Sequence, residues 1–501
     1  MSKKIKIYFT SDTHGYVLPV DYAKGGKVAS GVLSMGKKFV KDGNTLVIDG
    51  GDTIQGSPFT MYLSKLMFDT HPIALAMNKN GYDYATLGNH DFNYGQEYLN
   101  KYVEALDAKM LCANVDGLEI AASDIKVLEN GLRVGIVGAV TDWVNIWEKP
   151  AHLEEIKISD PLLAIKAELE KIRDHVDLSI CIYHGGYERN IETDEILSDS
   201  GENRAWEICK ELDFDLLLTG HQHIPAAGKL VHGTYTVQPA NNGIHFLEIE
   251  GIVSEAGVEF TSELKKGVED FDPEGLAELL RIEKEVQKWL DEPVGHFSAP
   301  LEVDEKVAMA LNGSPIADFF NQVQLWATGA DISATSLGNV VKGFNKSVTV
   351  RDVVSTYVYT NTLTVVEITG KQLTQLLERP ASYLELDEAG QPQVSRSFLE
   401  PKIEHYNYDF FAGLAYNVDL NEPVGKRVNQ VAVDGKIIAD QDVFTLCINN
   451  YRSTGAGGYD ILADCPIVKA HAVEMSELII SYLEEYKFVE VQNFEAPKYK
   501  F

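Results

Sequence analysis

The hydrophobic pattern of the chain changes near residue 250. Before this point, short apolar runs alternate with longer amphipathic stretches; the runs read KIKIYF, TLVIDG, GLRVGIVGAV, DLSICIYH, DFDLLLTG and YTVQP. Alternation of short strands with helices is typical of layered α/β proteins. The pattern predicts an α/β domain over residues 1–261.

A charge-rich stretch follows over residues 262–292. Asp272 can cap a helix there, with Pro273 in its first turn. The apolar residues of this stretch recur at near-helical spacing: Leu276, Leu279, Leu280, Val286, Trp289 and Leu290. We predict a linker helix between two domains.

A different pattern occupies residues 293–501. The segment AMALNGSPIADFFNQVQLWATG has helical character, whereas LTVVEITG and VFTLCINNY resemble strands. The segment VNQVAVDGKIIA is expected to form a hairpin that turns at Asp434 and Gly435. This mixture predicts a second domain of the α+β class.

The composition agrees with a folded, water-soluble chain. Apolar residues make up 45% of the 501 positions, and no uninterrupted apolar run approaches the roughly 20 residues of a membrane helix. The N-terminal MSKKIKIYFTSDTHG has no apolar signal core. The five cysteines are odd in number and lack CxxC spacing, which favours reduced thiols. We expect a cytoplasmic protein without a membrane partner, unless an export segment has been trimmed from the start.

The net charge of −31 bears on the class of ligand. A surface this acidic repels long polyanions, so a role in coating DNA or RNA is excluded. A small phosphorylated molecule remains possible where local positive charge outweighs the global field.

Polar residues recur directly after the apolar strands of the first domain. In an open α/β sheet, the carboxyl ends of the strands border one crevice, so residues placed there converge in space. The residues in question are Asp12, His14, Asp52, Asn89, His90, Asp91, His184, His221 and His223. We predict that they form a single site.

The chemistry of this set indicates metal binding. Asp, Asn and neutral His supply the oxygen and nitrogen ligands that Mn²⁺, Fe²⁺, Co²⁺ and Zn²⁺ accept. Seven candidate ligands are too many for one ion, and they suit two ions that share a bridging carboxylate. Two dications with two ionised Asp residues leave net positive charge for a phosphate ester, and they can activate water as the nucleophile.

The motifs DTH, GDTIQ, GNHD, YHGG and GHQH, in this order, resemble those of the calcineurin-like metallophosphoesterase superfamily. The resemblance covers residues 1–250 and implies a four-layer α/β domain with two metal ions. It implies one ion on Asp12, His14 and His223, a second on Asn89, His184 and His221, and Asp52 as the bridge.

The GNHD motif carries two further expected roles. The resemblance makes His90 the residue that protonates the leaving alkoxide or neutralises charge on the phosphoryl oxygens. Asp91 is then expected to orient His90 through a hydrogen bond.

The addition of a linker helix and a second domain resembles the two-domain 5′-nucleotidase family, whose C-terminal domain binds the nucleoside. The segments ADISATSLGN, YNYDFFAGLAYNVDL and INNYRSTGAGGYD are similar to the 2′,3′-cyclic-nucleotide 2′-phosphodiesterase/3′-nucleotidase branch. The arginines of the Asn-x-Gly-Gly-Ile-Arg motif, typical of the 5′-nucleotidase branch, are absent from residues 331–343, where Lys342 is the only cation.

Candidate substrate contacts follow from that resemblance. Tyr359 and Tyr451 match the aromatic pair that holds the base, with Tyr406 and Tyr408 in reserve. Arg452 begins the glycine-rich RSTGAGG and Asp460 lies two residues beyond it; these two side chains can meet phosphate and ribose hydroxyls. Each tyrosine can equally be a half-buried strand residue, and the glycine-rich segment a flexible turn.

Three hypotheses of function remain at this point. The first is a monomeric dimetal hydrolase that converts 2′,3′-cyclic nucleotides and 3′-nucleotides to nucleoside and phosphate. The second is a 5′-nucleotidase or nucleoside-diphosphate-sugar hydrolase. The third is an idle nucleotide-binding or sensor protein, which a complete ligand set with His90 disfavours.

Overall fold

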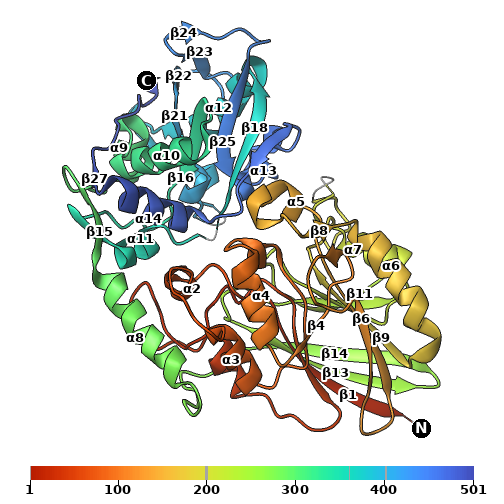
Figure 1. Cartoon of the computed structure of the whole chain (residues 1–501). Coiled ribbons are helices and arrows are strands. Elements are labelled where there is room, and N and C mark those ends of the chain that lie inside the picture. Colours follow the sequence, from red (N-terminus) through yellow and green to blue (C-terminus); the bar gives the residue numbers. More distant parts are fainter. Residues whose placement is uncertain (1, 198–200, 360, 401–402) are drawn as a thin grey trace. The chain divides into compact units, whose positions relative to one another are not determined.

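The computed structural model describes residues 2–197, 201–359, 361–400 and 403–501, and it divides the chain into two compact units, Met1–Lys288 and Trp289–Phe501 (Figure 1). Within the described residues, no helix is both long and apolar enough to span a bilayer.

The first unit contains two six-stranded sheets. The first sheet has the order β14 (Gly257–Lys265), β13 (Phe246–Ser254), β1 (Lys3–Thr10), β2 (Thr45–Asp49), β3 (Tyr84–Ala85), β4 (Lys109–Met110). The second has the order β11 (Ala226–Val231), β12 (Thr234–Gln238), β10 (Leu216–Thr219), β9 (Leu178–His184), β7 (Arg133–Val140), β6 (Ser123–Val127). Each of the six apolar runs predicted as strands forms one of these strands.

The two sheets bury one core between them. Ile7 and Phe9 of β1 share a hydrophobic cluster with Ile180 of β9 and Leu218 of β10. Alternate residues of the second sheet point the other way and pack with α6 (Pro161–Ile172) and α7 (Ala205–Glu211). The connections through α3 (Pro72–Lys79) and α4 (Gln96–Ala105) link the parallel strands β2, β3 and β4. This is the predicted layered α/β domain.

The stretch predicted as a linker helix is only partly helical. Residues 262–265 belong to β14, which pairs with β13, and Pro273 lies in a turn that precedes the helix. Helix α8 covers Ala277–Asp291, with Leu279, Val286 and Leu290 fully buried. The helix is therefore confirmed over Ala277–Asp291, whereas residues 262–265 are a strand because they pair with β13, which lies outside this stretch.

The second unit is built around a mixed five-stranded sheet. Its order is β21 (Asp409–Ala412), β16 (Ile332–Ser336), β25 (Val443–Asn449), β18 (Leu363–Thr369), β26 (Ile467–Ala470). A four-stranded sheet accompanies it: β24 (Lys436–Ile437), β23 (Val428–Val433), β22 (Leu414–Asp419), β28 (Lys498–Lys500). The core joins α12 (Gly370–Ala381) to both sheets through Leu373, Leu376 and Leu377.

Two local predictions in this unit can be checked. The hairpin is confirmed: Val433 pairs with Lys436, and Asp434 and Gly435 have φ of 49° and 73°, as a two-residue turn with two positive φ values requires. The long helical segment is two helices, α9 (Lys306–Asn312) and α10 (Pro315–Thr328), because Gly313 has φ of 86° and Pro315 begins a new helix.

Candidate dinuclear metal centre

The predicted site residues follow the carboxyl ends of parallel strands. Asp12 and His14 come after β1, Asp52 comes after β2, His184 ends β9, and His221 comes after β10. Asn89 begins a short 3-10 helix, Asn89–Phe92, beyond β3. The expected convergence of these residues is therefore present in the fold.

Strained backbone marks this site. Five of the seven predicted ligands have positive φ although none is glycine: Asp12 (55°), His14 (48°), Asp52 (55°), His221 (74°) and His223 (58°). The left-handed conformation costs an L-residue on the order of 1–2 kcal/mol. Such strain clusters at functional sites, where the surrounding structure imposes it.

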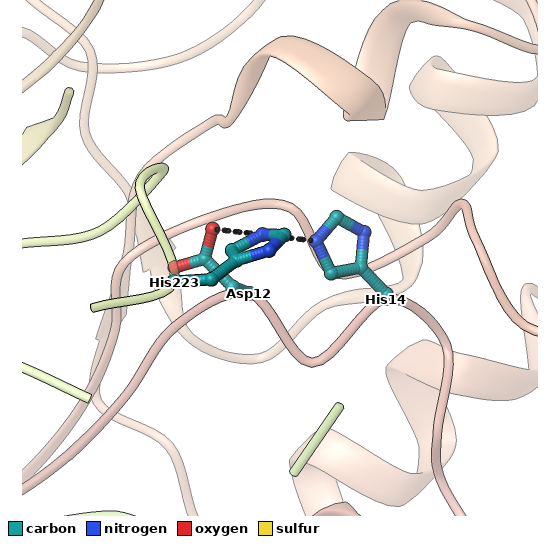
Figure 2. A group of neighbouring side chains, drawn as sticks. All are labelled: Asp12, His14 and His223. Atoms are coloured by element: carbon teal, nitrogen blue, oxygen red, sulfur yellow. Dashed lines mark hydrogen bonds and ion pairs between the residues drawn. The ribbon is translucent and has the colours of Figure 1, made fainter. Parts of the chain in front are cut away.

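The first cluster consists of Asp12, His14 and His223 (Figure 2). Nε2 of His223 lies 3.4 Å from Oδ1 of Asp12 and 3.0 Å from Nε2 of His14. One potential ligand atom from each of the three residues falls within 4.8 Å of the others. The arrangement has the size and donor types of a metal site.

The second cluster consists of Asp52, His184 and His221. Nε2 of His184 lies 3.1 Å from Oδ2 of Asp52, and Nδ1 of His221 lies 2.8 Å from Oδ1 of Asn89. The same Asp52 oxygen lies 3.9 Å from Nε2 of His14 in the first cluster. Asp52 thus stands between the two clusters, where a bridging carboxylate was predicted.

Hydrogen bonds behind three histidines orient their rings. Nδ1 of His14 faces the carbonyl of Gln55 at 3.0 Å, and Nδ1 of His184 faces that of Gly50 at 2.6 Å. Nε2 of His221 faces Oε1 of Glu202 at 2.8 Å. Because these oxygens only accept, each facing nitrogen carries the hydrogen when the ring is neutral. The opposite nitrogen then presents its lone pair to the cluster, as a metal ligand requires.

The pKa values of the buried side chains in the clusters indicate an ionised Asp52 that needs positive charge beside it. Burial alone would raise the pKa of Asp52, but His184 and His90 hold it well below its usual range. Burial opposes the charged form of His184 as well, yet the facing Asp52 raises the pKa of that imidazole to about 10. Burial lowers the pKa of His14 to about 3, so His14 is a neutral donor.

Two orphaned atoms show where a cation fits. Oδ2 of Asp52 and Nε2 of His184 are buried and lie 3.1 Å apart without a hydrogen-bond partner, and their next charged neighbours, Nε2 of His14 and Oδ1 of Asp12, lie only at 3.9 and 4.0 Å. Buried polar atoms of this kind need a partner. A divalent cation between them satisfies both atoms.

The structure corrects the expected role of Asp91. Its carboxylate accepts hydrogen bonds from the backbone N–H groups of Gly88, Asp52, Thr53 and Ile54, at 2.8, 3.0, 2.8 and 3.0 Å. These four amides use both oxygens, so Asp91 holds the loop that carries Asp52 and does not orient His90.

The ring of His90 is held by a different residue. Nδ1 of His90 faces Oδ1 of Asn93 at 2.9 Å, and Nδ2 of Asn93 donates to Oε2 of Glu148 at 2.6 Å. Asn93 could have been noticed in GNHDFNYG, three residues beyond His90. Glu148 and Glu202 follow no motif, and nothing in the local sequence points to them.

The candidate substrate residues of the second unit differ in accessibility. Tyr359 and Tyr451 are 36% and 47% exposed, and Asp460 is also exposed. The reserve candidate Tyr408 is buried and donates its hydroxyl to the carbonyl of Ala310. The other reserve candidate, Tyr406, is half-buried, so Tyr359 and Tyr451 are the more accessible of these tyrosines.

Arg452 has a structural role that the sequence did not reveal. Its side chain is 1% exposed and forms a buried ion pair with Asp409, with Nη2 2.9 Å from Oδ1. Its remaining hydrogens go to Oδ1 of Asn407 and to the carbonyls of Tyr406 and Ala456. The guanidinium secures its own loop and has no donor left for a phosphate, which corrects the expected substrate contact.

Comparison with known proteins agrees with this geometry. The family of calcineurin-like phosphoesterases matches residues 5–225, and the 5′-nucleotidase C-terminal domain matches residues 293–464. The chain therefore combines a calcineurin-like phosphoesterase domain with a 5′-nucleotidase C-terminal domain. Relatives that match nearly the whole chain are named as nucleotidases and nucleotide phosphodiesterases, and calcineurin-like phosphoesterases bind two divalent metals. The two clusters are the two candidate metal sites of this metallophosphoesterase.

Individual relatives extend over nearly the whole chain. The trifunctional nucleotide phosphoesterase YfkN of Bacillus subtilis is 25% identical and matches 97% of this chain, which spans 38% of that longer protein. The 2′,3′-cyclic-nucleotide 2′-phosphodiesterase/3′-nucleotidase of Haemophilus influenzae is 24% identical over 96% of this chain and 84% of its own. A crystal structure of a Staphylococcus aureus protein described as a 5′-nucleotidase aligns over 100% of both chains, with a TM-score of 0.74 and 28% identity.

Proposed function

We propose that this metallophosphoesterase hydrolyses 2′,3′-cyclic nucleotides and 3′-nucleotides, with nucleoside and phosphate as final products. The observation that carries the proposal is the pair of histidine and carboxylate clusters that share Asp52, with His90 beside them. The substrate class is supported by the names of the Bacillus and Haemophilus relatives.

The two ions would be held by Asp12, His14 and His223 and by Asn89, His184 and His221, with Asp52 between them. We propose Mn²⁺, Zn²⁺, Fe²⁺ or Co²⁺, because the donor set is mixed nitrogen and oxygen. When bound, such ions supply positive charge for the phosphoryl oxygens and raise the acidity of the attacking water.

His90 acts on the leaving oxygen in this proposal. Its Nδ1 hydrogen is engaged with Asn93, and the described residues offer no partner to Nε2. In the imidazolium form, which carries a hydrogen on both nitrogens, Nε2 is therefore the nitrogen that delivers its proton to the departing ribose oxygen, and the ring is left neutral with its hydrogen on Nδ1. The imidazole of His14 lies 5.2 Å away, centroid to centroid, so His90 borders the first cluster.

Tyr359 and Tyr451 are proposed to stack on the base. Two rings stacked on one base contribute about 1–3 kcal/mol each and discriminate little among bases. Burial raises the pKa of Tyr359, so its phenol stays protonated and its ring remains neutral for stacking.

The alternative, hydrolysis of 5′-nucleotides, needs a cation near residues 331–343. Lys342 lies 3.4 Å from Asp352 and is partly neutralised by it. Lys306, which the sequence pattern did not single out, donates to the carbonyl of Gly338 at 2.9 Å and brings a second positive charge to that loop. The positive charge of Lys306 at this loop is the observation that favours the alternative.

The experiment is phosphate release by the purified protein with added Mn²⁺. We compare 3′-AMP and 2′,3′-cyclic AMP with 5′-AMP and a nucleoside-diphosphate sugar, and we use His90→Ala as the control. Preference for the first two substrates supports the proposal. Preference for 5′-AMP selects the alternative, and the absence of metal-dependent release from all four favours a binding protein.

A further inference from the structure

One short segment contacts both sides of the candidate centre. Helix α5 (Val144–Trp147) ends at Trp147, and Glu148 follows it directly. The ring of Trp147 stacks on His221, with centroids 5.4 Å apart and an interplanar angle of 25°. The carboxylate of Glu148 accepts from Asn93, which in turn holds His90. Two consecutive residues thus support a candidate metal ligand and the proposed proton donor.

Burial and hydrogen bonds hold the Glu148 side chain in this position. Its side chain is 2% exposed, and both carboxylate oxygens are used. Oε2 accepts from Asn93, whereas Oε1 accepts from the backbone N–H of Lys149 at 2.7 Å and faces Nδ1 of His152 at 2.8 Å. The carboxylate therefore has one fixed orientation toward Asn93.

The directions of the hydrogen bonds show how Glu148 orients the side-chain amide of Asn93. A carboxylate only accepts, so it requires the NH₂ end of the Asn93 amide to face it. The carbonyl end of the same amide must then face His90, and this oxygen requires a hydrogen on Nδ1 of the ring. The opposite nitrogen, Nε2, is left for the substrate.

We propose that Glu148 is a positioning residue that sets the polarity of the Asn93 amide and thereby selects Nε2 of His90 for proton exchange with the leaving oxygen. The inference rests on the proposed phosphoesterase activity. Without Glu148, no other described residue accepts from the NH₂ group of Asn93, so this group can turn toward Nδ1 of His90.

The kinetic test uses two esters that differ in their need for a proton donor. A ribose alkoxide is a poor leaving group and needs protonation, whereas p-nitrophenolate leaves without it. We expect Glu148→Ala to lower kcat for 3′-AMP by about 10- to 100-fold, the range of a lost supporting contact, and to leave kcat for p-nitrophenyl phosphate nearly unchanged. Glu148→Gln retains an acceptor oxygen, so its kcat for 3′-AMP should lie between those of wild type and Glu148→Ala.

Controls separate this role from general damage. Glu154→Ala removes an exposed carboxylate from the same loop and should behave as wild type for both esters. Bound metal, measured by elemental analysis, should be the same in wild type and Glu148→Ala. Equal losses on both esters, or a loss of metal, would overturn the proposal in favour of a merely structural role.

A spectroscopic readout keeps the inference independent of turnover. Protein with ¹⁵N-labelled histidine should show His90 as the Nδ1–H tautomer, assigned by the signal that disappears in His90→Ala. Glu148→Ala should shift this signal toward the Nε2–H form. An unchanged tautomer contradicts the inference even if the enzyme is active, whereas a shifted tautomer in a protein inactive on every ester contradicts only the proposed function.

Discussion

Nε2 of His184 lies 3.1 Å from Oδ2 of Asp52, and both atoms are buried without a hydrogen bond to any described residue. The pair is the clearest sign of where a cation is needed, since a buried carboxylate and a buried imidazole nitrogen are both left unsatisfied. Its consequences can be measured.

Metal binding should stabilise the folded protein. A ligand that binds only the folded state adds about 2.7 kcal/mol when its free concentration is 100 times Kd. We expect the melting temperature to rise as Mn²⁺ is titrated into chelator-treated protein, as followed by scanning fluorimetry. Asp52→Asn, which weakens a shared ligand, should flatten the titration; an equal rise in that variant would contradict the assignment of Asp52.

The buried ion pair of Arg452 and Asp409 should stabilise the second unit. Removing one member leaves an uncompensated buried charge, which costs about 3–5 kcal/mol. We expect Arg452→Met to lower the urea midpoint of that unit clearly. Lys500→Met, which removes the exposed partner of Asp419, serves as the matched control and should leave the midpoint where it is. A wild-type midpoint for Arg452→Met would argue against the structural role.

The two exposed tyrosines should affect binding of the nucleoside rather than the chemical step. Loss of one stacking contact of about 1–3 kcal/mol corresponds to a rise in KM of roughly 5- to 150-fold. We expect this rise for Tyr451→Ala and Tyr359→Ala with 3′-AMP, and none with p-nitrophenyl phosphate. Tyr486 has the same exposure as Tyr451, 47%, so Tyr486→Ala is the control; an equal rise in that variant would point to an indirect effect.

His71 should make stability depend on pH. The side chain is fully buried among the rings of Phe68, Tyr98 and Tyr102, and neither ring nitrogen has a partner in the described part of the chain. Burial lowers the pKa of His71 to about 3 from an ordinary 6.5. Between these values the unfolded chain binds a proton that the folded chain does not, so stability falls as pH falls below 6.5.

The contribution of His71 lowers the free energy of unfolding by about 1.4 kcal/mol per pH unit below pH 6.5, or about 2 kcal/mol between pH 6.5 and pH 5. We expect His71→Leu to lose this part of the pH dependence of urea unfolding. His296 is exposed on β15 (Pro293–Phe297), so His296→Leu should retain the wild-type slope. If His71→Leu keeps the full slope, His71 is not the group responsible.

The features that could be predicted from the sequence are local or depend on strand order alone. The six strands that were predicted in the first unit have apolar runs of the right length, and the turn at Asp434 and Gly435 uses residues that tolerate positive φ. The convergence of Asp12, Asp52 and His184 follows from one rule, because the carboxyl ends of parallel strands border one edge. The expected cytoplasmic location and monomeric state stay predictions.

Contacts between distant loops were decided only by the tertiary structure. Asp91 is adjacent to His90 in sequence, yet its carboxylate bonds to the backbone of residues 52–54, whereas Asn93 and Glu148 hold His90. Likewise, Arg452 lies beside a glycine-rich segment in the sequence, but in the fold it forms a buried ion pair with Asp409 of β21. A side chain can bond only to what the fold places within a few ångströms, and that placement is set by the packing of the whole domain rather than by the neighbouring residues of the chain.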